Sequence, residues 1–121
     1  LYPGTGSRNE KGDFDNILNC PLRAGDGSSE FRSAVSEVIL PGLIAFQPEL
    51  LFVSAGFDAH ALDPLAGLNL QDSDYGWVTT KLMEIADKST NGRLISALEG
   101  GYDLAALSSS VASHVEELVK A

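Results

Sequence analysis

The spacing of hydrophobic residues along the chain predicts three helices. The first lies at about 29–46, where apolar residues recur at near-helical intervals, although Pro41-Gly42 should kink or divide it. The second steps by three or four residues over 75–85. The third is the clearest, because its apolar residues mark one face of a helix. These residues are Leu104, Leu107, Val111, Val115 and Leu118.

Continuous apolar runs at 50–56 and 94–98 predict two buried strands, covered on both faces. A third, short strand is expected at about 16–20, just before Pro21. Strands thus alternate with helices, which predicts a three-layer α/β/α fold with a partial parallel sheet of about three strands and three helices. A sheet of only three strands exposes two apolar edges. We therefore expect these edges to be covered by further strands, by another chain or by a second copy of the protein.

Charge and composition narrow the classes of function. Seventeen acidic residues against eight basic ones give a formal net charge of −9. This charge argues against nucleic-acid binding and tolerates a cationic substrate, although its simpler role is to keep the protein soluble. No apolar stretch approaches the length of a membrane span. Cys20 is the single cysteine, which indicates a reducing compartment and hence the cytoplasm. The sequence does not begin with methionine, which predicts a processed or truncated start.

Polar residues that could carry chemistry follow the two apolar runs. Asp58 follows the first and Tyr102 the second, and parallel sheets gather ligands beyond the carboxyl ends of their strands. The simpler interpretation makes the aspartate a turn residue and the tyrosine a packing residue. His60 could bind zinc beside Asp58 or bond to backbone or solvent, and the spacing leaves both open. Asp63 precedes a proline and is expected to organise its loop, while His114 fits helix packing better than catalysis.

Three motifs stand in register along the chain. They are Tyr2-Pro3-Gly4-Thr5-Gly6, then Ser54-Ala55-Gly56-Phe57-Asp58-Ala59-His60 with Asp63-Pro64-Leu65, and finally Leu98-Glu99-Gly100-Gly101-Tyr102. Together they resemble the last part of the histone deacetylase, acetylpolyamine amidohydrolase and acetoin utilization family, most closely its bacterial and class II members. The resemblance implies that residues 1–121 form the C-terminal part of a histone deacetylase-like domain with an arginase-like fold.

The resemblance also implies roles for individual residues. Asp58 matches one of three zinc ligands, and Tyr102 matches the tyrosine whose hydroxyl stabilises the oxyanion formed from the acetyl carbonyl. His60 matches no ligand of the family, so the resemblance favours a structural role for it.

Four further residues match the substrate tunnel of the family. Tyr2 matches an aromatic position that lines the tunnel, and Gly100 and Gly101 would let the backbone approach its floor closely. Leu65 stands where polyamine-specific members carry an acidic residue. The resemblance therefore favours an acyl-lysine or another neutral-tunnel substrate over a polyamine.

Other catalytic parts of the family have no match in the chain. The family's Asp-x-His zinc ligands and its adjacent His-His pair lie in an earlier segment, before the part that this chain matches, and Asp58-Ala59-His60 is not their counterpart. We therefore expect the isolated chain to be inactive, and zinc-dependent deacetylation of acetyl-lysine or a small acetylated amine to belong to a longer parent protein. The alternative is a non-catalytic α/β interaction or scaffold module derived from this fold. A ureohydrolase of the related arginase fold is disfavoured, because that group binds paired metals through several Asp and His residues.

Overall fold

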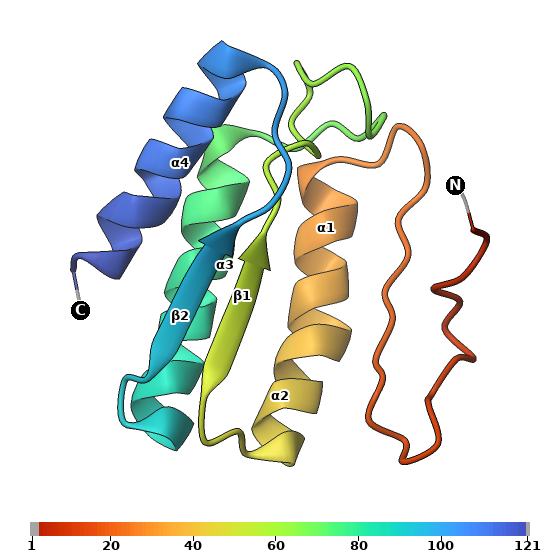
Figure 1. Ribbon diagram of the computed structural model, residues 1–121, viewed down its shortest axis with the longest axis vertical. Helices are drawn as coiled ribbons and strands as arrows, with labels where there is room; N and C mark the ends of the chain where they lie inside the picture. Colours follow the sequence, from red (N-terminus) through yellow and green to blue (C-terminus); the bar gives the residue numbers. More distant parts are fainter. Residues whose placement is uncertain (1–2, 121) are drawn as a thin grey trace.

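A computed structural model describes residues 3–120 of the chain (Figure 1). Its elements follow the predicted alternation of helices and strands. In chain order they are α1 (Ser28–Ala34), η1 (Val35–Ile39), α2 (Leu40–Phe46), β1 (Leu51–Ala55), α3 (Asp72–Ile85), η2 (Ala86–Thr90), β2 (Leu94–Leu98) and α4 (Leu104–Leu118). The predicted helices and the two apolar strands are thus confirmed, and no helix within 3–120 is long and apolar enough to cross a membrane.

The sheet has two parallel strands rather than the predicted three. β1 pairs with β2 in a register that joins Phe52 to Ile95 and Ala55 to Leu98. Leu51 faces the helices and is buried, whereas Phe52 is 62% exposed and Ile95 is 50% exposed. Within residues 3–120 the helices therefore cover one face of the sheet, so the expectation of strands covered on both faces is wrong for this part of the chain.

The segment at 16–20 is extended but forms no strand. The continuous helix of α1 and α2 lies between it and the sheet, so neither strand of residues 3–120 can pair with it (Figure 1). Leu18 instead packs closely on Gly42 of α2, and the side chain of Asn19 donates to the carbonyl of Ser7 at 2.9 Å. Apolar residues beside a proline predicted the extended shape, but they could not predict what the segment would pack against.

The first helix runs unbroken from α1 through η1 to α2, with a π-helical stretch where the sequence predicted a kink or division. Pro41 has no N–H to donate and would crowd the preceding turn of a regular helix. The wider turn of η1 comes directly before it, and the N–H of Leu40 accordingly bonds to the carbonyl of Val35. The helix ends at Gln47, which adopts a left-handed conformation with φ 53°.

The final helix packs on α3 through small and polar residues that lie beside its predicted apolar stripe. Its buried residues are Ala106, Ser110 and His114, whereas Leu104 is 81% exposed. Small residues allow this close approach, since a Cβ added to Gly76 of α3 would lie 3.4 Å from a backbone oxygen of α4. The predicted stripe is therefore confirmed in part: Leu107 and Val111 pack against the buried cluster of Phe57, Leu70 and Tyr75. Leu104 and Val115 are exposed.

His114 has the helix-packing role expected of it. Its Nδ1 lies 2.6 Å from Oγ1 of Thr79 on α3, and its Nε2 lies 2.9 Å from Oγ of Ser96 on β2. The ring also packs edge-on against Phe57. Burial lowers the pKa of His114, so the ring is held neutral between one helix and the sheet.

Candidate functional site

The carboxyl ends of the two strands bring the loops that follow them together. Beyond the last register pair, the N–H of Glu99 donates to the carbonyl of Ala55 at 2.9 Å. The N–H of Phe57 donates to the carbonyl of Gly100 at 2.8 Å. Asp58 and Tyr102 therefore stand on hydrogen-bonded neighbouring loops at one edge of the sheet, as the parallel topology predicted.

The carboxylate of Asp58 lies against two glycines that leave room for it. A Cβ added to Gly100 would lie 3.0 Å from Cγ of Asp58, and one added to Gly56 would lie 2.9 Å from its Oδ1. Both distances are shorter than ordinary van der Waals contact, so a side chain at either position would displace the carboxylate. The glycines thus form a cradle for Asp58, and for Gly100 this is a tighter constraint than the sequence suggested.

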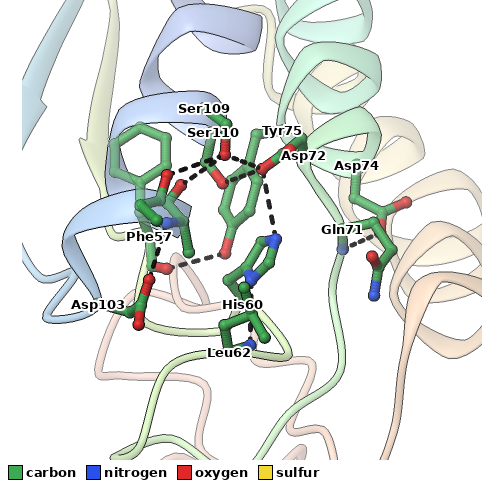
Figure 2. Close-up of polar contacts among 12 residues, drawn as sticks. Phe57, His60, Leu62, Gln71, Asp72, Asp74, Tyr75, Asp103, Ser109 and Ser110 are labelled. Atoms are coloured by element: carbon green, nitrogen blue, oxygen red, sulfur yellow. Dashed lines mark hydrogen bonds and ion pairs between the residues drawn. The ribbon is translucent and has the colours of Figure 1, made fainter.

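Contacts on both sides of Asp58 hold its loop in place (Figure 2). The hydroxyl of Tyr75 donates to the carbonyl of Phe57 at 3.2 Å, and the two rings pack at a centroid distance of 5.0 Å. Burial raises the pKa of Tyr75, and the negative charges of Asp58 and nearby carboxylates raise it further. The phenol consequently stays protonated and remains a hydrogen-bond donor to the loop.

His60 anchors the same loop to the two helices behind it (Figure 2). Its Nδ1 accepts from the N–H of Leu62 at 3.1 Å, so Nε2 carries the proton and faces Oδ1 of Asp72 at 3.3 Å. That oxygen also accepts from the hydroxyls of Ser109 and Ser110, each at 2.8 Å. These contacts give His60 a structural setting, and its side chain is buried.

Asp63 connects the loop of Asp58 to the loop of Tyr102. Its Oδ1 accepts from the N–H of Leu65 at 2.9 Å, and its Oδ2 accepts from the N–H of Tyr102 at 2.7 Å and of Asp103 at 3.4 Å. Burial alone would raise the pKa of Asp63, but these hydrogen bonds outweigh it and the pKa is lowered. The carboxylate is therefore ionised and organises its loop, as its place before a proline predicted.

The remaining sequence-predicted site residues differ in what surrounds them. Tyr102 and Leu65 are exposed, at 59% and 64%. Gly101 has φ 138°, and an added Cβ would lie 2.8 Å from Leu107 and 3.1 Å from Phe57. A glycine is therefore required there by backbone conformation and packing. Tyr2 lies outside the described residues.

Sequence reasoning missed Asp72, Tyr75 and the paired serines of α4. Asp72 begins a helix, where the helix dipole alone favours an acidic residue. Its link to His60 depends on how two helices meet, which spacing does not reveal. The signal that could have found Tyr75 is its hydroxyl, since a tyrosine on a buried helix face must satisfy that group with a partner.

The donor set of this edge fits a metal ion only in part. Asp58 supplies one carboxylate, a ligand type that zinc accepts. Across the part of the chain that the structure describes, no three His, Cys, Asp or Glu side chains group closely enough to hold a metal ion. Asp58 can thus serve as one ligand of a set completed by groups outside residues 3–120.

Comparisons with known proteins agree on one family. Residues 1–118 match the family described as "Histone deacetylase domain". The chain is 45% identical over 114 residues to "Histone deacetylase 10, chloroplastic" of Oryza sativa, covering 92% of this chain and 26% of that protein. It is 37% identical over 101 residues to "Histone deacetylase-like amidohydrolase" of Pseudomonas aeruginosa, covering 84% of this chain and 27% of that protein.

The fold agrees with a solved structure of the same kind. The crystal structure of the HDA15 HD domain superposes with a TM-score of 0.90 and 32% identity, covering 99% of this chain and 34% of that one. The predicted partial α/β/α fold with a parallel sheet is thereby confirmed. The chain spans about a quarter to a third of the length of these relatives.

Proposed function

Because the chain belongs to the histone deacetylase family, we propose that it is the C-terminal part of a zinc-dependent deacetylase domain. The parent reaction is hydrolysis of the amide of acetyl-lysine or of a small acetylated amine. One observation carries the proposal: Asp58 and Tyr102 stand on neighbouring loops that are hydrogen-bonded to each other beyond two parallel strands. Such an edge lets a metal ligand and an oxyanion donor serve one substrate carbonyl.

Asp58 is proposed as a zinc ligand. Its carboxylate is cradled by Gly56 and Gly100, and the flanking Phe57 and His60 are fixed by hydrogen bonds. The loop that carries this carboxylate is therefore already ordered before an ion binds. Zinc, when bound, supplies a Lewis acid that polarises the acyl carbonyl and activates a water molecule. The other ligands and the His-His pair would come from outside this chain.

Tyr102 is proposed as the donor that stabilises the oxyanion. Its side chain is exposed and starts from a backbone N–H fixed by Asp63, so the phenol is accessible to a bound substrate. One preplaced donor of this kind contributes about 3 kcal/mol to transition-state stabilisation. Leu65 and Tyr2 would border the acyl chain of the substrate, and an apolar Leu65 disfavours a second ammonium group there.

Two further proposals follow for the isolated chain and its surroundings. With one ligand of the usual three, residues 1–121 alone are expected to be inactive. The open sheet face at Phe52 and Ile95, which are 62% and 50% exposed, would be covered in the parent by other parts of the same domain. No nucleic acid or membrane is proposed as a partner, and the cytoplasm is the proposed compartment, although some relatives are named chloroplastic.

The test uses the full-length protein that contains this chain. Wild type should release acetate from an acetyl-lysine peptide, lose that activity with a chelator and regain it with zinc. Tyr102→Phe should lower kcat about 100-fold to 1,000-fold with little change in KM, because only the transition state uses the phenol. Phe14→Leu, at an exposed aromatic residue distant in sequence from both strand ends, is the control and should leave kcat unchanged. Full activity of Tyr102→Phe, or acetate release by the isolated chain, would refute the assignment.

A further inference from the structure

We propose that Asp63 is a positioning residue that sets the place of Tyr102 relative to Asp58, an inference that rests on the proposed function. Asp63 lies in the same loop as Asp58, and its Oδ2 bonds to the N–H of Tyr102 at 2.7 Å across 39 residues of sequence. A single carboxylate therefore ties the loop of the proposed zinc ligand to the loop of the proposed oxyanion donor.

The carboxylate of Asp63 is fully engaged in this task. It is 7% exposed, and its two oxygens accept from three backbone N–H groups, those of Leu65, Tyr102 and Asp103. Hydrogen bonds from N–H groups to an ionised carboxylate are roughly twice as strong as those between neutral groups. Asp63 has no proton or free oxygen to offer a substrate, so its effect on the reaction must pass through the groups that it holds.

Tyr102 needs such an anchor because its exposed ring does not hold the residue in place. The ring is 59% exposed, and the preceding Gly100 and Gly101 have no side chains with which to anchor the backbone. On the other side, Asp103 begins α4 and caps it by accepting from the N–H of Ala106 at 2.9 Å. The bond from Tyr102 to Asp63 thus fixes the loop between a glycine hinge and a rigid helix.

Kinetics of the full-length protein test the inference. Asp63→Asn keeps the shape of the side chain but removes the charge and one hydrogen-bond acceptor. If the phenol of Tyr102 moves by up to about 1 Å, kcat should fall about 10-fold to 100-fold while KM changes little. The same substitution in a Tyr102→Phe background should cost almost nothing further, because the phenol through which Asp63 acts is already gone. Asp74→Asn is the matched control, a buried aspartate with its own backbone donor on α3, and should leave kcat unchanged.

Hydrogen exchange gives a second readout that a general loss of stability would not reproduce. Exchange at the amide of Tyr102 should quicken in Asp63→Asn and stay at the wild-type rate in Asp74→Asn. Unchanged exchange at Tyr102, or losses of kcat that simply add in the double variant, would overturn the positioning role while leaving the proposed function in place. A wild-type protein without deacetylase activity would overturn the proposed function itself.

Discussion

Replacing Gly100 with alanine should damage the proposed zinc site while leaving the fold intact. Gly100 follows β2, and its added Cβ would lie 3.0 Å from Cγ of Asp58 and 3.0 and 3.1 Å from its two carboxylate oxygens. Carbon atoms in favourable contact stand about 3.5–4.0 Å apart, so the overlap is roughly 0.5–1 Å. Because the obstructed atoms are the end of a side chain, the carboxylate can turn away at small cost.

The expected magnitudes follow from that geometry. Gly100 has no positive φ, so alanine is free of backbone strain and gains about 0.4–1 kcal/mol by restricting the unfolded chain. This gain roughly offsets the cost of moving the carboxylate, and the net change in the free energy of unfolding should stay within about 1 kcal/mol. A ligand displaced by up to about 1 Å should lower kcat/KM about 10-fold to 100-fold.

The assay compares zinc affinity, deacetylase activity and thermal stability in the full-length protein. Gly92→Ala is the control, since it also adds a methyl group but meets nothing within 4 Å, and it should lower stability through its φ of 75° without affecting zinc. Gly100→Ala should show weaker zinc binding in a competition with a chelator and a nearly unchanged Tm. Wild-type zinc affinity in Gly100→Ala would refute the reasoning that this glycine holds the carboxylate in place.

Two further predictions concern buried titratable groups. Asp74→Ala should lower the free energy of unfolding by about 2–4 kcal/mol. The substitution leaves three donors around a fully buried carboxylate without their partner: Nε of Arg32, the hydroxyl of Ser28 and the N–H of Gln71. The cost is at the lower end for a buried ion pair because the Arg32 side chain is 37% exposed. Burial would raise the pKa of Asp74, but its hydrogen bonds outweigh this and lower it, so the stabilisation exists above about pH 4 and is lost as pH falls through the folded pKa. Urea unfolding should show the wild type and variant converging in acid. For His114, burial lowers the pKa, so the unfolded chain takes up the proton first and stability falls as pH drops below about 6.5. His114→Gln should flatten the Tm between about pH 7.5 and 5, and an unchanged slope would contradict this.

The sequence predicted the elements that local pattern governs. The apolar runs at 50–56 and 94–98 became β1 and β2, and the order of elements predicted their parallel pairing. The parallel pairing in turn placed Asp58 and Tyr102 at one edge. These inferences succeeded because strand content, period and connection length are properties of neighbouring residues.

Contacts between distant segments could not be predicted in the same way. The bond from Asp63 to Tyr102 and the link from His60 to Asp72 join residues that no spacing rule relates. An aspartate before a proline predicts a well-ordered loop, but which N–H groups it accepts from depends on how the next loop arrives. The sequence likewise could not predict what the segment at 16–20 packs against, which is helix α2 and not a strand.

The partly exposed apolar stripe of α4 illustrates a general limit of hydrophobic periodicity. A stripe of leucine and valine identifies the most apolar face of a helix, but small residues decide where another helix can approach most closely. On α4, Ala106 and Ser110 admit α3, and Leu104 and Val115 are left 81% and 44% exposed. The exposed stripe continues toward Leu98 at the end of β2, which is 65% exposed. An apolar surface of this kind calls for a partner, and under the proposed function the rest of the parent domain is the partner that this surface would meet.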